Sequence, residues 1–264
     1  TSFYFGMVYT ESLFLLLVLL ALRLSRQERW WWAAGVAAIA SATRIVGIVL
    51  VPAMFFQLLQ REVSTPQITG LLPKLMQRVI AIGSWLRGTY RVITKRREEL
   101  FAILMGSMGL VLYMSYLQHA FDDPLRFLSV QEEFGGGRSE SLVLYPQVIW
   151  RYFKILFTAE LQWQAWLSFT QEFAAGTLGL IGIVWNWRRI PWSWMLFALG
   201  AFLIPTLTGT FSSLSRYILV CIPLFVTLGI LTAEHRWWRW GWFALSGVLL
   251  TVNLALFISG VWVA

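Results

Sequence analysis

The chain has 264 residues, of which 58% are hydrophobic and 13% are charged, so its composition excludes an ordinary soluble globular protein and indicates a membrane protein. Its net charge of +8 does not indicate nucleic-acid binding, because the basic residues gather between hydrophobic segments. The positive-inside rule places basic residues there in membrane proteins. The single cysteine, Cys221, excludes an intrachain disulfide. The sequence starts at Thr1 without a basic, signal-peptide-like stretch, and we expect it to be the C-terminal part of a longer protein.

Long apolar runs recur along the chain, and several approach the roughly 20 residues that a helix needs to cross a bilayer. We therefore predict an all-α, polytopic integral membrane protein with about eight hydrophobic helices, in a single transmembrane domain over residues 1–264. The hydrophobic segments are 3–23, 31–43, 45–60, 100–118, 165–187, 192–209, 216–233 and 240–262.

The second and third segments are too short for relaxed spanning helices at about 1.5 Å per residue. Gly35, Thr43 and Gly47, with Pro52 beyond them, favour a helix that is broken near Arg44. Both flanks of this pair of segments are basic, so the pair must enter the membrane and return, as two short spans or as a re-entrant hairpin. This topology places Arg44 on the side of the membrane away from the cytoplasm.

The charges of the connecting stretches give one consistent orientation. Residues 61–99 carry eight Lys or Arg and are predicted to be cytoplasmic, as are the Trp- and Arg-rich turns 186–189 and 235–240. The stretches 119–164 and 208–216 then face outward. Within the outer stretch, the aromatic and basic residues 150–154 are typical of an interfacial helix.

The cytoplasmic stretch 61–99 has apolar residues at helical spacing, and its basic residues share another face. Two interpretations stay open: a basic amphipathic helix on anionic lipid, or a solvated loop that fixes topology. The apolar positions are Leu71, Leu75, Val79, Ile82 and Leu86, and the basic ones are Arg87, Arg91 and Lys95.

Glu11 lies near the outer end of the first hydrophobic segment, and with Arg44 it is one of two charges set against lipid-facing sequence. A charge at the middle of a span costs about 2.5–3.5 kcal/mol on insertion scales, so it is kept where it is paired, hydrated or chemically used. A carboxylate withdrawn from water has a raised proton affinity, which suits a general base. The alternative is that Glu11 pairs with an arginine such as Arg44 and joins two helices.

Arg216 follows Ser212-Ser213-Leu214-Ser215, which is typical of a helix start, so Arg216 falls in a first helical turn. A cation there opposes the helix dipole, and a bound anion would reverse that penalty. At an outer membrane face the natural anion is a lipid phosphate. The alternative is a snorkelling arginine that touches bulk headgroups.

The remaining candidates are weaker. Asp122-Asp123-Pro124 offers oxygen ligands for a divalent cation, but adjacent aspartates before proline favour a simple turn. His119 and the tyrosines Tyr9 and Tyr217 are typical of residues that anchor an interface. The sequence contains no phosphate-binding glycine loop, no Cys/His metal spacing and no Gly-x-Ser-x-Gly motif.

Several short motifs, in order along nearly the whole chain, resemble the PIG-V family of GPI mannosyltransferase 2 proteins and their bacterial relatives, which are GT-C type glycosyltransferases. The motifs are Phe3-Tyr4-Phe5, Tyr9-Thr10-Glu11-Ser12-Leu13-Phe14, Ala40-Ser41-Ala42-Thr43-Arg44, Leu214-Ser215-Arg216-Tyr217 and Pro223-Leu224-Phe225.

The resemblance implies transfer of mannose or a similar hexose from a polyprenyl-phosphate sugar to a lipid or glycan acceptor at the outer or luminal face. It marks Glu11 as a candidate catalytic residue and Arg44, Arg216 and Tyr217 as candidate substrate-binding residues. It also implies a main catalytic base in a first outer loop, which would lie before Thr1. A bacterial plasma membrane is expected rather than the endoplasmic reticulum, and no cofactor is implied beyond an optional divalent cation.

Two other classes of function fit the same residues. A transporter or flippase of lipid-linked sugars would use the same anion-binding arginines. A scaffold subunit of a membrane complex would be insensitive to neutralising Glu11 or Arg216.

Overall fold

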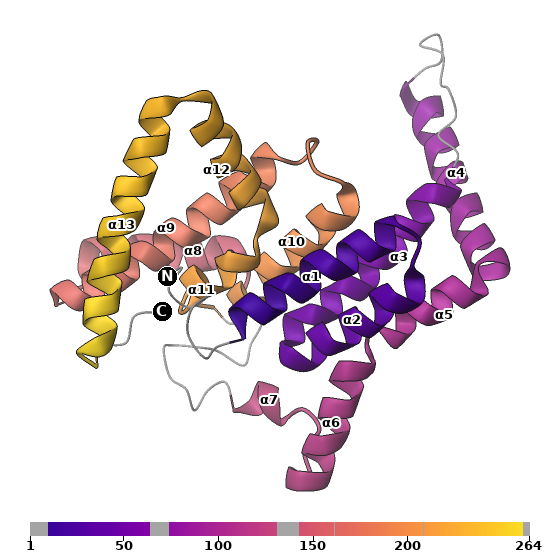
Figure 1. Ribbon diagram of the computed structural model, residues 1–264, viewed down its shortest axis with the longest axis horizontal. Helices are drawn as coiled ribbons and strands as arrows, with labels where there is room; N and C mark the ends of the chain where they lie inside the picture. Colours follow the sequence, from indigo (N-terminus) through magenta and orange to yellow (C-terminus); the bar gives the residue numbers. More distant parts are fainter. Residues whose placement is uncertain (1–9, 64–73, 131–142, 161, 208, 261–264) are drawn as a thin grey trace. The chain divides into compact units, whose positions relative to one another are not determined.

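The structure is a computed structural model that describes residues 10–63, 74–130, 143–160, 162–207 and 209–260 (Figure 1). Every regular element in these ranges is a helix, as predicted. The chain divides into two compact units, Leu17–Tyr113 and the combination of Thr1–Leu16 with Met114–Ala264, which are described separately below. The motifs at Phe3-Tyr4-Phe5 and Tyr9 lie outside the described residues.

Within the described residues, each predicted hydrophobic segment contains a helix or a broken helix. Helices in the first half of the chain are α1 (Glu11–Arg26), α2 (Trp30–Thr43), η2 (Ile45–Val49), α3 (Leu50–Glu62), α4 (Lys74–Lys95), α5 (Arg97–Met105) and α6 (Met108–Phe121). The helices that follow are α7 (Arg126–Ser129), α8 (Tyr145–Thr158), α9 (Trp163–Trp185), α10 (Trp192–Thr206), α11 (Leu214–Tyr217), η3 (Ile218–Val220), α12 (Ile222–Glu234) and α13 (Arg236–Ile258).

Three described helical stretches are long and apolar enough to cross a membrane: Ile45–Glu62, α9 and α13. The number rises to five if two bent pairs each form one span: α5 with α6, bent by 43°, and α11–η3 with α12, bent by 77°. The protein is therefore compatible with a multi-pass helical membrane protein. Membrane crossing by the other predicted segments stays a prediction.

The predicted break near Arg44 is confirmed. Helix α2 ends at Thr43, Arg44 is extended with φ −148° and ψ 135°, and a 3-10 turn follows. Gly47 permits this sharp return, because a Cβ at residue 47 would lie 2.5 Å from the carbonyl oxygen of Ala40. The break therefore depends on the small residue that follows it.

The prediction that segment 45–60 is too short to span was wrong. The helical stretch continues to Glu62 and reaches 18 residues. The two charged residues at its end are held by partners, since Arg61 forms an ion pair with Glu28 and Glu62 accepts a hydrogen bond from Arg96 at 2.9 Å. These pairs let the helix continue past the last apolar residue.

In the first unit to be described, Leu17–Tyr113, small residues allow close helix contacts. A Cβ on Gly109 of α6 would lie 1.8 Å from the carbonyl oxygen of Ala38 of α2. Beside this contact the buried Ser41 hydroxyl lies 3.1 Å from the carbonyl oxygen of Gly106 and accepts a hydrogen bond from the Leu110 amide at 3.3 Å. Such small and hydroxylated residues are typical of helix contacts in membranes.

The stretch 61–99 contains a long helix, α4, whose side chains are described from residue 82 onward. Its buried face consists of Ser84, Gly88 and Val92, and Trp85 stacks on Phe56 of α3. Of the predicted apolar face, Ile82 and Leu86 are exposed, while Leu71 lies outside the described residues. The helix thus packs through one face and leaves apolar side chains on another.

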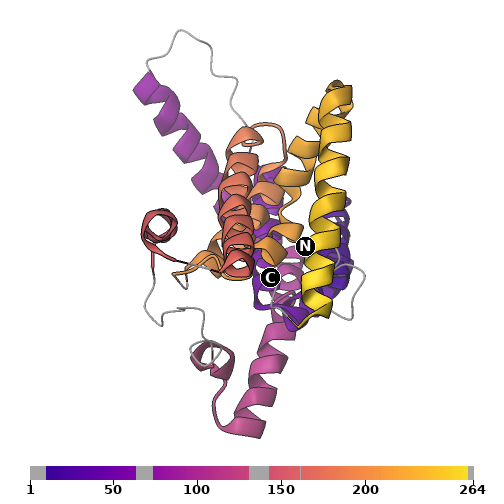
Figure 2. The same cartoon turned by 90° about the vertical axis from the view of Figure 1, so that its left-hand side faces the viewer.

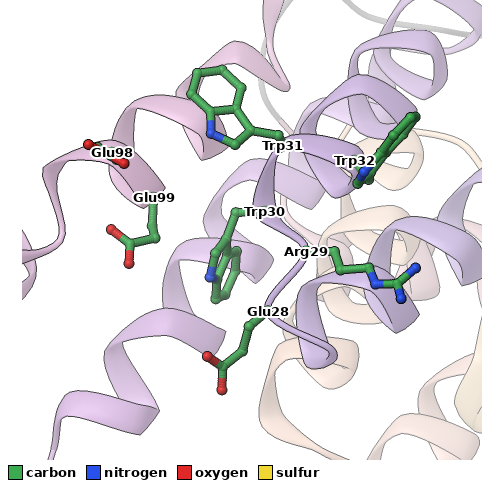
Figure 3. Close-up of a pocket in the computed structure, with 7 residues that line it drawn as sticks. All are labelled: Glu28, Arg29, Trp30, Trp31, Trp32, Glu98 and Glu99. Atoms are coloured by element: carbon green, nitrogen blue, oxygen red, sulfur yellow. The ribbon is translucent and has the colours of Figure 1, made fainter.

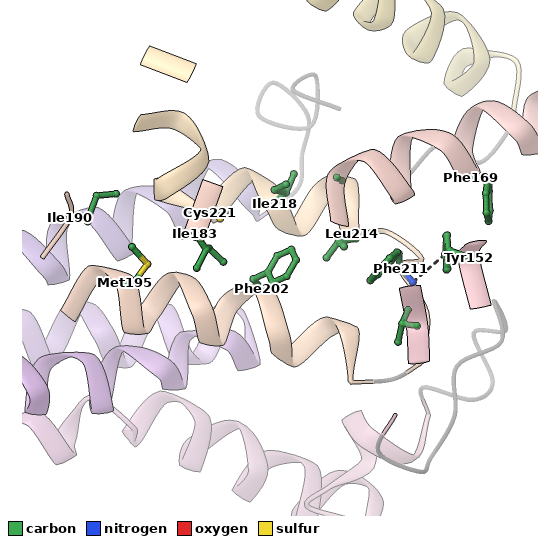
Figure 4. Packing of buried hydrophobic residues seen from close by; sticks show 12 residues of the cluster. Tyr152, Phe169, Ile183, Ile190, Met195, Phe202, Phe211, Leu214, Ile218 and Cys221 are labelled. Atoms are coloured by element: carbon green, nitrogen blue, oxygen red, sulfur yellow. Dashed lines mark hydrogen bonds between the residues drawn. The ribbon is translucent and has the colours of Figure 1, made fainter. Parts of the chain in front are cut away.

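The second unit has a core of buried apolar and aromatic side chains from α8, α9, α10 and α11 (Figure 4). The rings of Tyr152 and Phe169 stack with centroids 4.8 Å apart, and Tyr152 also contacts Phe211 at 4.7 Å. On α9, Gly179 and Gly182 let the Phe202 ring and the α12 backbone approach closely. The core therefore extends directly to the segment that carries Arg216.

Candidate functional site

The short helix α11, which carries Arg216, is preceded by a tight turn. Ser213 lies in the left-handed region, with φ 64°, and Gly209 does too, with φ 85°. A left-handed serine is uncommon and persists where surrounding contacts hold it. The turn that precedes the predicted substrate-binding residue Arg216 therefore contains two residues in the left-handed region.

One carboxylate and one phenol hold this turn. Glu172 of α9 accepts a hydrogen bond from the Ser213 amide at 3.0 Å through Oε1 and one from the Tyr152 hydroxyl at 2.9 Å through Oε2. The same hydroxyl accepts a hydrogen bond from the Phe211 amide at 3.1 Å and lies 3.2 Å from the Thr210 hydroxyl. Figure 4 shows the contact between Tyr152 and Phe211 as a dashed line. Two helices thus fix the turn through its backbone amides.

The protonation state of Tyr152 supports this role. Burial raises the pKa of its hydroxyl well above the ordinary value, and the charge of Glu172 raises it further. The phenol therefore stays protonated at physiological pH, and its O–H donates a hydrogen bond to the Glu172 carboxylate. A second contact from α8, the hydrogen bond from Arg151 to the carbonyl oxygen of Gly209 at 2.9 Å, holds the start of the turn.

At the end of the turn, Arg216 meets Glu11 of α1. The Nε and Nη2 atoms of Arg216 both donate to Oε1 of Glu11, at 3.1 and 2.7 Å. Glu11 is completely buried, whereas the Arg216 side chain keeps 14% of its surface exposed. The pair is therefore sealed on the side of the carboxylate and accessible on the side of the guanidinium.

This pair supplies the anion that the sequence argument required for Arg216. The Glu11 carboxylate lies in the first turn of α1, where the helix dipole favours negative charge, and it neutralises the Arg216 cation on the four-residue helix α11. The arginine partner that the sequence suggested for Glu11 was Arg44, but the structure brings Arg216 to it. Arg44 is the C-cap residue of α2 and belongs to the other unit.

Of the other predicted residues, Tyr217 ends α11 and is half-buried directly after Arg216. Asp122 follows α6 with φ 55°, and Asp123 turns back on its own chain. The Asp123 carboxylate accepts hydrogen bonds from the Leu125 amide at 2.9 Å and the Ser129 hydroxyl at 3.2 Å, in the manner of an aspartate turn. No group of three or more His, Cys, Asp or Glu that could hold a metal ion occurs within the described ranges.

An apolar groove lies beside α11. It has a volume of about 560 Å³ and is lined by α9, α12, α13 and Ser215, the residue before Arg216. Helix α13 (yellow in Figures 1 and 2) follows α12 directly in the chain, and the two helices contact each other. At one end of the groove the amides of Gln171 and Asn253 exchange two hydrogen bonds of 2.9 Å. An apolar cavity thus begins next to the charged pair.

A second hollow, of about 350 Å³, lies in the unit Leu17–Tyr113 (Figure 3). The hollow is lined by Trp30, Trp31 and Trp32 and by acidic residues. Two of the acidic residues are already in ion pairs: Glu28 with Arg61, and Glu99 with Arg96 at 3.0 Å. Hydrogen bonds to Glu62 and Glu99 raise the pKa of Arg96, so this arginine stays charged. Figure 3 shows the Arg29 side chain directed away from the two glutamates of α5. The arrangement is typical of an interfacial edge rather than of a reaction site.

Sequence reasoning missed Glu172, Tyr152, Arg151 and Thr210. The stretch 150–154 was interpreted as an interfacial helix, and it is indeed helical as part of α8, but two of its residues point to the turn before Arg216. A glutamate inside the hydrophobic segment 165–187 was the signal that could have been used, since a charge there needs a partner.

Comparisons of this chain with protein-family models, with curated proteins and with solved structures found no match.

Proposed function

We propose that the protein is a membrane glycosyltransferase of the GT-C type, which transfers a hexose such as mannose from a polyprenyl-phosphate sugar to an acceptor hydroxyl. The observation that carries the proposal is the Glu11–Arg216 pair, in which a buried carboxylate meets a partly exposed guanidinium beside an apolar groove. The motif resemblance supports it, because Glu11 and Arg216 are the positions that the resemblance marks.

In this proposal Arg216 binds the phosphate of the donor. A guanidinium presents donors in a planar fork that matches phosphate oxygens, and it stabilises the charge that develops on a leaving phosphate. The turn held by Glu172 and Tyr152 keeps the backbone that carries Arg216 in place. Pre-organisation of this kind favours the transition state, because no reorganisation is needed when the charge appears.

Donor binding then changes the state of Glu11. When phosphate oxygens take over the donors of Arg216, the guanidinium moves off Glu11 and opens the buried carboxylate to the acceptor hydroxyl. The acceptor hydroxyl transfers its proton to Glu11, its oxygen bonds to the anomeric carbon, and the bond from that carbon to the phosphate oxygen breaks. The polyprenyl phosphate leaves with the electron pair. Arg216 would thus cover Glu11 until a donor is bound.

The test is sugar transfer in detergent, with full-length protein, a polyprenyl-phosphate mannose donor and a lipid acceptor, in the absence of a membrane gradient. Transfer that depends on Glu11 and Arg216 supports the proposal. A flippase is favoured instead if the same variants block movement of the donor across vesicle membranes while no transfer occurs in detergent. The control is Glu28→Gln, which removes a carboxylate from the other unit.

A further inference from the structure

Helix α4 carries a stripe of exposed apolar side chains on the face opposite to the one that packs. These side chains keep between 53% and 70% of their surface exposed, and they belong to Ile82, Leu86, Tyr90 and Ile93. At about 100° per residue the four positions fall within an arc of about 80° on the helix surface. The buried side of α4 is centred on Gly88, about 160° away. We call this exposed face the apolar stripe.

The apolar stripe is bordered by positive charge. The 22 residues of α4 include five Lys or Arg and no Asp or Glu. Arg87 and Arg91 are exposed, lie one turn apart, and each directly follows a residue of the stripe in the sequence. At the C-terminal end of the helix, Glu62 and Glu99 both bind Arg96, at 2.9 and 3.0 Å. An apolar face with a basic border complements a surface that is apolar inside and negative at its edge.

Helix α4 lies at the end of a candidate membrane span. The span Ile45–Glu62 ends with α3, and Figure 1 shows α4 (purple) passing the C-terminal end of that helix. Trp85 stacks on Phe56 with ring centroids 5.4 Å apart, and a Cβ on Gly88 would lie 2.6 Å from the Val63 side chain. If α3 spans the membrane, its end lies at the membrane surface, so the apolar stripe is within reach of lipid headgroups.

We propose that α4 lies on the bilayer, with the apolar stripe among the upper parts of the acyl chains and with Arg87 and Arg91 at the phosphates of anionic phospholipids. Lysine and arginine side chains at such a border reach the headgroups while the helix body stays at the acyl boundary. The surface lies outside the site of the proposed function and does not depend on it.

Charge and position select the bilayer as the occupant of the stripe. A second copy of the chain would bring the same basic helix against itself, and like charges that meet across an interface cost free energy. The bilayer, in contrast, supplies an apolar phase and negative charge at the end of the span on which α4 packs. An acidic partner protein is the remaining alternative, and it leaves the stripe exposed in purified vesicles.

Insertion of the stripe is measured by quenching of a bimane dye on single cysteines in the full-length protein, in a Cys221→Ala background. One dye is placed by Leu86→Cys in the stripe and the other by Lys95→Cys, which is exposed on the side of the helix away from the stripe. The protein is reconstituted in phosphatidylcholine vesicles with or without one third phosphatidylglycerol. The quenchers are acrylamide in water and a phosphatidylcholine with a nitroxide near the top of its acyl chain.

We expect acrylamide to quench the dye at residue 86 several-fold less than the dye at residue 95 in vesicles that contain phosphatidylglycerol. The nitroxide lipid should give the reverse order, because the stripe then contacts acyl chains while Lys95 faces water. High salt should reduce both differences, since it screens the attraction between the arginines and the lipid phosphates.

The arginines supply the part of the binding that depends on lipid charge. In vesicles with phosphatidylglycerol, the ratio of inserted to free helix should fall about fivefold in Arg87→Gln and roughly 25-fold when Arg91→Gln is added. The matched control is Arg188→Gln with Arg189→Gln, which removes two exposed charges from another predicted cytoplasmic turn and should leave the ratio unchanged. In pure phosphatidylcholine all these variants should match the parent, because the lipid carries no net charge.

All the substituted positions are exposed, and size-exclusion chromatography checks that each variant is folded. Equal quenching by acrylamide at residues 86 and 95 overturns the proposal and leaves the stripe to water or to a partner protein. Shielding that increases with protein density at fixed lipid composition also overturns it and assigns the stripe to a second copy. Shielding that persists unchanged in the double variant Arg87→Gln, Arg91→Gln rejects recognition of anionic lipid.

Discussion

Arg216 and Glu11, which are 205 positions apart in the sequence, meet through a single oxygen atom, Oε1 of the glutamate. Two donors of one guanidinium converge on it, and the carboxylate is completely buried. Geometry of this kind is compatible with a purely structural ion pair and with a catalytic one. The two roles differ in how turnover responds when either residue is replaced.

The first prediction is that Glu11→Gln lowers the rate of transfer per folded molecule by roughly 10²–10⁴-fold, because an amide cannot accept the proton of the acceptor hydroxyl. Stability should also fall, since removing one partner of a buried ion pair costs about 3–5 kcal/mol. Turnover is measured on the folded fraction after size-exclusion chromatography. A variant that is destabilised but retains normal turnover would show that the pair is only structural.

The second prediction concerns the donor affinity of Arg216. Lysine keeps the charge but loses the planar fork, so Arg216→Lys should weaken donor binding. Arg216→Ala should weaken it further, by about 1.5–3 kcal/mol, which is roughly ten- to hundredfold in Kd. Binding of the polyprenyl-phosphate sugar is measured by calorimetry in detergent. Intact affinity in a folded Arg216→Ala variant contradicts the phosphate role.

The third prediction is that Tyr152 acts as a positioning residue. Tyr152→Phe leaves the buried amide of Phe211 without its acceptor, which costs about 1–3 kcal/mol, and should loosen the turn before Arg216. We expect the KM for the donor to rise by about tenfold and kcat to change less. The control is Tyr145→Phe, because the Tyr145 hydroxyl donates to the carbonyl oxygen of Gly176 and not to the turn. Equal KM changes in both variants would reject the positioning role.

The fourth prediction tests the contact between α6 and α2. Gly109→Ala should lower the free energy of unfolding by about 1–3 kcal/mol, because its Cβ would meet the backbone of Ala38 and neither helix can yield easily. Gly35→Ala on α2 should be neutral or stabilising by about 0.4–1 kcal/mol, since its Cβ would enter open space. Thermal unfolding in one detergent compares the two. Equal melting temperatures for both variants would argue against the close helix contact.

The fifth prediction concerns topology and comes from the charge pattern. In a Cys221→Ala background, cysteines placed at Lys95 and Leu144 should react with an impermeant thiol reagent from opposite faces of the membrane. Both positions are exposed in the structure, so access within the fold does not limit the reaction. Reaction of both cysteines from one face would overturn the orientation.

The helical segments could be predicted because hydrophobic runs and their breakers are local signals. The break at Arg44 is one example: Gly47 and a short apolar run indicated it, and the backbone turns there. The bends within 100–118 and 216–233 were not predicted. The first bend occurs around Gly106-Ser107, where the helix loses its regular hydrogen bonding although no proline is present. The second occurs at Cys221, two residues before Pro223.

The site could be predicted only in part, because a sequence names charged residues but not their partners. Glu11 and Arg216 stood out as charges beside apolar segments, yet 205 positions separate them and nothing local pairs them. Glu172 was missed because its partners Tyr152 and Ser213 lie 20 and 41 positions away in the sequence. Its role becomes visible only when α9 brings it to the Ser213 amide.

The 77° bend at Cys221 has a consequence for the way the protein enters a membrane. The backbone from Ile218 to Pro223 is buried against neighbouring helices, and η3 contacts both α9 and α10. Alone in lipid, this interrupted helix would expose unpaired peptide groups, each at a cost of several kcal/mol. We therefore expect biogenesis to be ordered, with α9 and α10, which leave the ribosome earlier, already in the bilayer to receive the bent segment as it is released.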